Sequence, residues 1–76
     1  MSEYLYGINP AFEAIRSGRR QLYHLYLNQG SSNNPRLKKL AQLAEKQHLP
    51  LSWVDKAKLF DLCQTREHQS CVLETG

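Results

Sequence analysis

The chain has 76 residues, 41% of them hydrophobic, and its ten Lys and Arg against seven Asp and Glu give a formal net charge of +3. This length allows one small domain with a single core and little room for an enclosed active site. The composition argues against disorder over the whole length, and we expect neither a membrane-spanning segment nor a secretory signal, because no apolar run is long enough. The positive charge suits an anionic partner without requiring one.

The first predicted helix follows an extended aromatic segment at residues 4–6, which is a candidate edge strand. Asn9 is expected to cap this helix, and Pro10 fits its first position because proline lacks the backbone N–H that would be unpaired there. Glu13 is then placed in the first turn, and Gly18 ends the helix in the left-handed conformation. Apolar residues at spacings of three and four form a core-facing stripe: Ile8, Ala11, Phe12, Ala14 and Ile15.

The middle of the chain predicts a strand, a loop and a second helix. Residues 22–27 are almost continuously apolar, which is typical of a strand buried on both faces. The loop at 28–34 is rich in Gly, Ser and Asn. Asn34 followed by Pro35 repeats the pattern of a cap and a proline, and the helix that they open is expected to run to about His48.

The remaining elements complete an alternation of helices and strands. Residues 51–54 predict a second strand, Asp55 is placed to cap a third helix, and residues 71–73 predict a last strand. The order helix, strand, helix, strand, helix, strand indicates an α/β fold with a small, mainly parallel sheet between layers of helices. The apolar strand at 22–27 is expected in the middle of this sheet.

Three arginines gather at the end of the first helix. Arg16, Arg19 and Arg20 begin a stretch, residues 16–39, that contains six Lys and Arg residues and no acidic residue. Guanidinium groups match phosphate oxygens with planar pairs of donors, and several on one edge could follow an RNA backbone. The alternative is a solvated helix end at which cations complement the helix dipole.

A polar segment before the last strand is a second candidate. Arg66, His68 and Gln69 are residue types that contact phosphate, ribose and base edges. Alternatively, His68 and Gln69 bond to the loop backbone and hold the entry of the strand. The aromatic side chains could stack on bases, but we expect a small domain to use most of them in its core: Tyr4, Tyr6, Tyr23, Tyr26 and Trp53.

No residue set indicates catalysis, cofactor binding or metal binding within the chain. There is no nucleophile elbow, no Gly-rich phosphate loop and no convincing carboxylate pair. Cys63, His68 and Cys71 fit no common zinc spacing. We expect the two cysteines to be free thiols in a reducing cytoplasm.

These residues together resemble a known family. The segments 6–10, 13–15 and 25–27, then Arg66 and the His-Gln pair at 68–69, are similar to the N-terminal substrate-binding domain of SpoU/TrmH-type RNA ribose 2′-O-methyltransferases. The nearest likeness is to bacterial enzymes that methylate a guanosine ribose in large-subunit ribosomal RNA. The resemblance covers nearly the whole chain.

The resemblance implies a three-layer α/β/α sandwich like that of the kink-turn-binding ribosomal proteins. It also implies that residues 1–76 are the N-terminal module of a longer protein, whose separate catalytic domain binds S-adenosylmethionine and forms a homodimer. None of the motifs of that second domain is present. The positions that match the family pattern are Gly7, Glu13, Arg66, His68 and Gln69. Relatives usually carry a glycine after the His-Gln pair, where this chain has Ser70 and Cys71.

The sequence therefore favours a cytoplasmic module that recognises RNA, expected to be ribosomal, and delivers it to a separate methyltransferase domain. The residues expected to bind RNA are Arg16, Arg19, Arg20, Arg66, His68 and Gln69. Two alternatives are a free-standing RNA-binding protein of the ribosomal type and a protein–protein or dimerisation module. The last of these predicts an exposed apolar patch in place of a basic one.

Overall fold

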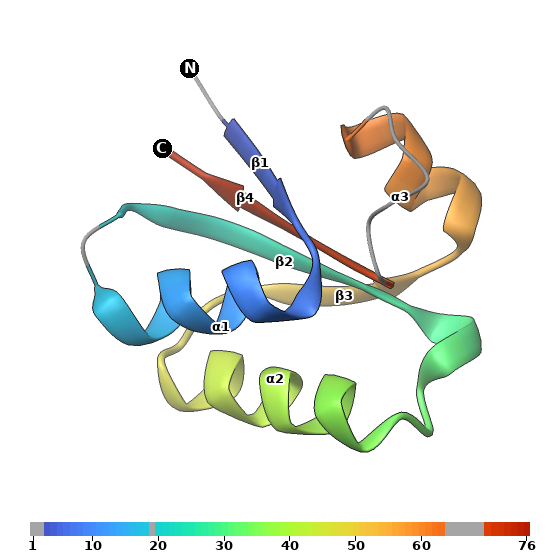
Figure 1. The fold of residues 1–76 in the computed structure, drawn as a ribbon, viewed down its shortest axis with the longest axis horizontal. Coiled ribbons are helices and arrows are strands. Elements are labelled where there is room, and N and C mark those ends of the chain that lie inside the picture. The colour runs from blue at the N-terminus through green and yellow to red at the C-terminus, as the bar shows by residue number, and fades with distance from the viewer. Residues whose placement is uncertain (1–2, 19, 64–69) are drawn as a thin grey trace.

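The structure, a computed structural model, describes residues 3–18, 20–63 and 70–76. Within these residues the chain alternates strands and helices in the order expected, preceded by an N-terminal strand (Figure 1). The elements are β1 (Glu3–Tyr6), α1 (Ile8–Ser17), β2 (Leu22–Asn28), the 3₁₀ turn η1 (Gln29–Ser31), α2 (Pro35–Lys46), β3 (Leu51–Val54), α3 (Lys56–Cys63) and β4 (Cys71–Thr75).

The described strands form one mixed sheet in the order β1-β4-β2-β3. The α/β class is confirmed and β1 is an edge strand, but the prediction of a mainly parallel sheet is wrong. β2 and β3 are parallel, whereas β4 is antiparallel to both of its neighbours, β1 and β2. The reason is that Cys71 pairs with Leu27, so β4 starts at the end of the sheet where β2 and β3 finish, and it runs back.

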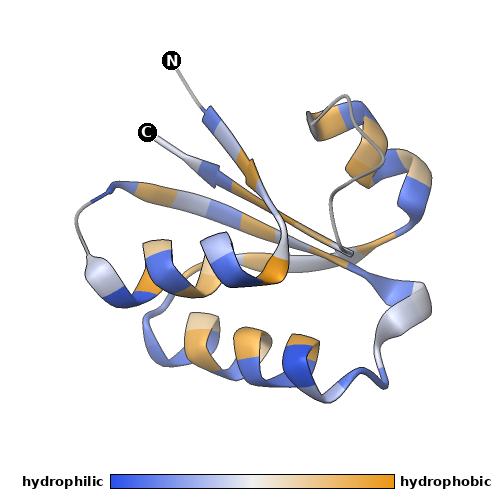
Figure 2. Cartoon of the chain, in the orientation of Figure 1, coloured by the Kyte–Doolittle hydropathy of each residue, from blue (hydrophilic) through white to orange (hydrophobic). Residues whose placement is uncertain are grey.

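The main core lies between one face of the sheet and the helices α1 and α2. Leu25 and Leu27 of β2 and Leu73 of β4 are fully buried there. The two helices contribute the predicted stripes, and Figure 2 shows hydrophobic residues alternating with hydrophilic ones along both. The buried members are Ile8, Ala11, Ala14 and Ile15 of α1 and Leu37, Leu40, Ala41 and Ala44 of α2. Phe12 is half-buried against this core.

The opposite face of the sheet is covered in part. Val72, which alternates with Cys71 and Leu73 along β4, is fully buried outside the main core cluster, as is Leu59 of α3. We therefore assign α3, which contacts β1, β2 and β4, to this second face. Burial of β2 on both faces was predicted, but only Leu25 and Leu27, on the main-core face, are fully buried. His24 and Tyr26, which pair with Glu74 and Val72 on the second face, are half-buried, and Tyr23, at the irregularity between Leu22 and His24, is 40% exposed.

The ends of α1 differ in how well they were predicted. Gly7, not Asn9, is the capping residue; the first helical bond runs from Ala11 N to Gly7 O at 3.3 Å. Pro10 still lies in the first turn, where its missing N–H costs nothing. Glu13 lies beyond that turn, which contains no acidic residue. Gly18 ends the helix at φ 63°, as expected.

The other two helices begin as predicted. Asn34 Oδ1 accepts a hydrogen bond of 2.9 Å from Arg36 N, and Asp55 Oδ1 accepts one of 2.9 Å from Lys58 N. α2 ends at Lys46, slightly before the predicted end, because His48 takes a left-handed φ of 59° and turns the chain toward β3.

Candidate nucleic-acid interface

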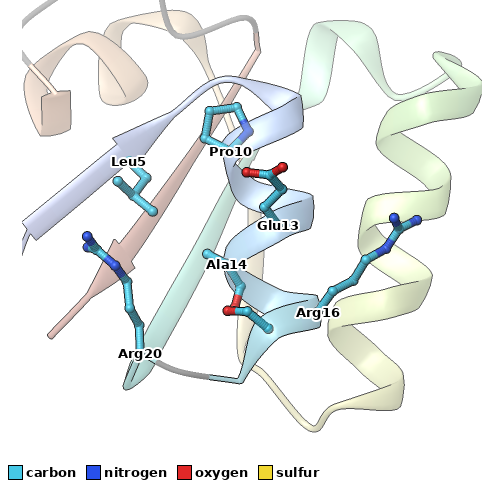
Figure 3. Close-up of a pocket in the computed structure, with 7 residues that line it drawn as sticks. Leu5, Pro10, Glu13, Ala14, Arg16 and Arg20 are labelled. Carbon is cyan, nitrogen blue, oxygen red and sulfur yellow. The ribbon is translucent and has the colours of Figure 1, made fainter.

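Arg16 and Arg20 line one open groove of about 580 Å³ between α1 and β1. Arg16 projects from the last turn of α1, and Arg20 follows the Gly18 cap that redirects the chain into β2. The guanidinium groups point apart: Figure 3 shows Arg20 lying toward β1 and Leu5, and Arg16 on the other side of α1, pointing toward α2. The rest of the lining is Leu5, Pro10, Glu13, Ala14 and Ser17.

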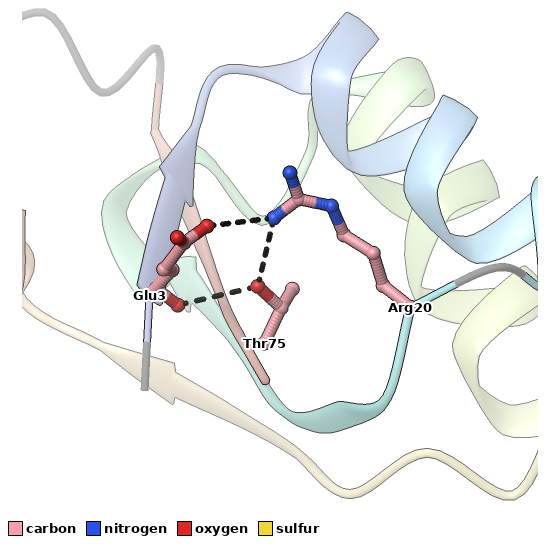
Figure 4. Close-up of polar contacts among 3 residues, drawn as sticks. All are labelled: Glu3, Arg20 and Thr75. Atoms are coloured by element: carbon pink, nitrogen blue, oxygen red, sulfur yellow. Dashed lines mark hydrogen bonds and ion pairs between the residues drawn. The ribbon is translucent and has the colours of Figure 1, made fainter. Parts of the chain in front are cut away.

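Arg20 is held at the edge of the sheet by two contacts. Its Nη1 lies 2.9 Å from Glu3 Oε2 and donates to Thr75 Oγ1 at 3.3 Å (Figure 4). The Thr75 hydroxyl donates in turn to the backbone carbonyl of Glu3 at 3.5 Å. The side chains of Arg20 and Glu3 are 43% and 66% exposed, so water screens their ion pair, which contributes at most about 1 kcal/mol. An incoming anion can therefore compete with Glu3 at little cost.

Arg16 is oriented by an aromatic ring. Its Cζ lies 5.2 Å from the centroid of the Phe12 ring, one turn earlier on α1. This cation–π contact holds the exposed Arg16 side chain along the surface of α1. Among the described residues a third arginine, Arg36, joins α2 to α1 by donating from Nη2 to Asn9 Oδ1.

The remaining predicted site residues, Arg19, Arg66, His68 and Gln69, lie outside the described residues, and their RNA contacts stay predictions. Ser70 is described: its carbonyl accepts from Asn28 N at 2.9 Å, and its hydroxyl lies 3.4 Å from that of Ser31. Arg20 precedes the start of β2, whereas Asn28 ends it, about 20 Å further along the strand. The structure therefore places Ser70 at the opposite end of β2 from Arg16 and Arg20.

The predictions from the sequence did not include two features of this surface, the contacts of Arg20 and the exposure of the aromatic residues. The contacts of Arg20 with Glu3 and Thr75 join residues 17 and 55 positions apart, and no local pattern indicates them. The aromatic residues expected in the core are in large part exposed, by 37–42% for Tyr4, Tyr6, Tyr23 and Trp53. The sequence did contain a signal for this exposure. Tyr4 and Tyr6 are two residues apart on a predicted edge strand, and alternate residues of a strand share a face, which places the two rings side by side at the border of the sheet.

The described residues contain no group of three or more His, Cys, Asp and Glu placed to hold a metal ion. Cys71 is a free, buried thiol of the core. No helix in the described part of the chain has the length and apolar character needed to span a membrane.

Comparison with known proteins agrees with a binding role. A scan against models of protein families matches residues 4–75 to the family described as RNA 2′-O ribose methyltransferase substrate binding. A search of curated proteins finds no match. The family match runs from β1 to β4 and includes every described helix, and it confirms the resemblance to this substrate-binding domain. The chain belongs to the substrate-binding family of RNA 2′-O ribose methyltransferases.

Proposed function

We propose that this domain holds ribosomal RNA for a ribose 2′-O-methyltransferase, gripping the RNA backbone in the groove between α1 and β1. The observation that carries the proposal is that Arg16 and Arg20 line the same groove, in a domain whose family binds RNA substrates. The Arg20 guanidinium exchanges Glu3 for a phosphate oxygen, and Arg16 donates from its N–H groups to a neighbouring phosphate. Arg19, between them in sequence, adds a third cation.

The domain acts by tethering rather than by chemistry. A catalytic domain in the same cytoplasmic protein, dimeric through that domain, carries out the methyl transfer. Holding the RNA beside it raises the local concentration of the target to about the millimolar range for a short flexible linker. The methyl donor, S-adenosylmethionine, belongs to that catalytic domain.

The second predicted element, Arg66 to Gln69, supplies shape or base contacts in this proposal. Loss of RNA affinity without loss of folding in a His68→Ala variant supports that role. Loss of folding in the same variant supports the alternative, in which His68 bonds to the loop backbone.

The groove is tested by salt-dependent RNA binding. Arg16→Ala and Arg20→Ala are each expected to weaken binding of an rRNA fragment about tenfold at low salt, and to flatten the slope of log affinity against log salt by about 1. Glu3→Gln is expected to strengthen binding about twofold to fivefold, because it removes the anion that competes for Arg20. Fluorescence anisotropy at several salt concentrations measures both effects.

Lys58→Ala is the matched control, since Lys58 is an exposed cation on α3, outside the groove. It should change neither affinity nor slope by comparable amounts. Equal binding by the parent and by an Arg16→Ala/Arg20→Ala double variant at every salt concentration would show that the groove does not contact phosphate.

A further inference from the structure

The face of the sheet opposite the main core carries a cluster of aromatic side chains. Tyr4 of β1 pairs with Glu74 of β4, which pairs with His24 of β2. Directly paired residues project from the same face of a sheet. In the next row, two residues along each strand, Tyr6 pairs with Val72, Val72 with Tyr26, and Tyr26 with Ser52. Two strands, β1 and β2, thus contribute aromatic rings to one face, with β4 between them.

α3 leaves much of this face open. Val72, in the second row, is fully buried, but Tyr4 and Tyr6 are 38% and 42% exposed. His24, Tyr26 and Glu74 are half-buried. We name the four aromatic residues Tyr4, Tyr6, His24 and Tyr26, together with Glu74, the aromatic face.

Two rings of the aromatic face, those of His24 and Tyr26, are held in place by contacts within the protein. The His24 and Tyr26 rings stack with centroids 4.4 Å apart and an interplanar angle of 30°. The Nε2 atom of His24 makes a hydrogen bond of 2.8 Å with Ser52 Oγ. Burial, then Glu74 and then Tyr4 raise the pKa of the Tyr26 hydroxyl, which indicates that both side chains lie near it. Rings ordered in this way lose little entropy when a planar ligand stacks on them.

We infer that the aromatic face binds unpaired bases of the RNA, with the Glu74 carboxylate accepting hydrogen bonds from the edge of a guanine. This inference rests on the proposed function and names the kind of RNA that the domain selects. Stacking on aromatic rings is the general means by which proteins hold single-stranded bases. Guanine presents two adjacent N–H donors on its Watson–Crick edge, which match the two oxygens of a carboxylate.

The charge of the aromatic face distinguishes a base from other occupants. A carboxylate in the middle of the rings repels a phosphate, so the RNA backbone must run elsewhere. An apolar protein surface would bury the Glu74 charge without a partner, which is costly. A base edge satisfies the carboxylate while its ring covers the tyrosines.

The position of β1 connects the aromatic face to the groove. β1 is an edge strand, and Leu5 lines the groove with Arg16 and Arg20 on one side of it. Tyr4 and Tyr6 flank Leu5 and project from the other side. An RNA strand that crosses β1 therefore places phosphates against the arginines and turns its bases onto the aromatic face. A duplex cannot do this, because its bases are paired inside.

The stacking role is tested with matched variants of an exposed residue. The probes are a labelled ten-nucleotide uracil RNA with one central guanine, and a duplex of the same length. Tyr4→Leu keeps an apolar side chain without a ring and is expected to weaken single-strand binding about tenfold, leaving duplex binding and the salt slope unchanged. Tyr4→Phe keeps the ring and should bind as the parent does. Trp53→Leu is the control, because Trp53 pairs with Leu27 and faces the other way.

The guanine contact is tested by replacing the central guanine with inosine, which lacks the 2-amino group. The replacement is expected to weaken binding to the parent about tenfold and to have little effect on a Glu74→Gln variant. Equal affinity of the parent for the two RNAs overturns the guanine contact.

The outcomes separate this inference from the proposed function. If the Arg16 and Arg20 variants weaken binding but Tyr4→Leu and Tyr4→Phe bind every RNA equally, the aromatic face does not bind bases, and the proposed function of the groove is still supported. If neither the arginine variants nor the Tyr4 variants change RNA binding, both the proposed function and this inference are wrong. Self-association of the parent in sedimentation, abolished by Tyr4→Leu, would make this face a protein interface and overturn the inference.

Discussion

Ser70 holds a backbone conformation that usually belongs to glycine. Its φ is 68°, in the left-handed region, immediately before β4 begins at Cys71. The relatives that this chain resembles usually carry a glycine after the His-Gln pair, and the geometry gives a physical reason: a Cβ atom is strained in this conformation by about 1–2 kcal/mol. The serine hydroxyl, 3.4 Å from that of Ser31, offsets part of the strain.

This strain predicts the order of stability of two variants. Both Ser70→Gly and Ser70→Ala lose the hydroxyl, but only alanine keeps the strained Cβ. We expect the Ser70→Gly variant to be more stable than the Ser70→Ala variant by about 1 kcal/mol in urea unfolding. The opposite order would show that position 70 does not require a left-handed backbone in solution.

Cys71 predicts a dependence of stability on alkaline pH. Burial raises the pKa of its thiol from 9.0 to about 12. Between these values the unfolded state loses the thiol proton while the folded state keeps it, so the unfolded state binds fewer protons and the free energy of unfolding falls as pH rises. The contribution of the Cys71 thiol to the free energy of unfolding is fully present below pH 9 and is lost progressively toward pH 12.

The measurement is urea unfolding between pH 8 and pH 10.5, with Cys71→Ala as the comparison. The alanine variant is expected to be less stable throughout, because Cys71 lies in the core, but to lose stability less steeply with pH. Tyr26, whose pKa is also raised, contributes in the same direction to both proteins and cancels in the comparison. Identical slopes would mean that the thiol does not control the alkaline loss.

At the scale of elements, α3 is stabilised by its cap and by the burial of Leu59. Asp55 Oδ1 accepts from Lys58 N, and Leu59 is fully buried on the second face of the sheet. The helix is short, so one satisfied N–H group is a large part of its local stability.

We therefore expect Asp55→Ala to lower the free energy of unfolding by about 1 kcal/mol, and Asp55→Asn to have little effect because the amide oxygen still accepts the bond. Thermal unfolding measures this directly: 1 kcal/mol lowers the melting temperature of a domain of this size by about 4–8 °C. Equal losses in the two variants would show that the charge of Asp55, rather than its capping bond, stabilises α3.

β1 shows how one element serves two surfaces. It is paired with β4 on one side and open on the other, and its alternation separates Leu5, toward the groove, from Tyr4 and Tyr6, on the aromatic face. The Arg20–Glu3 ion pair lies on the same side of β1 as Leu5, over the pairing of Glu3 with Thr75.

At the scale of the whole molecule, the groove between α1 and β1 and the aromatic face contribute different parts of RNA binding. In our proposal the groove supplies affinity that depends on salt and not on sequence, and the aromatic face supplies selection for unpaired bases. The net charge of +3 is modest, so the placement of the arginines matters more than the total. A domain with one core can carry both surfaces because its sheet is covered by two helices, α1 and α2, on one face and only in part, by α3, on the other.

The sequence by itself determined the local features. Asn34, Asp55 and Gly18 indicated helix ends that the structure confirms, and the apolar spacing indicated the buried stripes of α1 and α2. These signals act over a few residues, through backbone conformation and single hydrogen bonds, and can be read without the rest of the fold. The family resemblance rested on such short segments and was confirmed.

Only the tertiary structure decided the direction of β4, the partner of Arg20 and the exposure of the tyrosines. Each depends on residues far apart in the chain, such as Glu3 beside Thr75 and Tyr4 beside Glu74. The same alternation of helices and strands is compatible with β4 running either way, and the side of the sheet that each aromatic residue takes follows from that pairing. Long-range pairing is set by how the whole chain packs, because no short segment carries information about its distant partner.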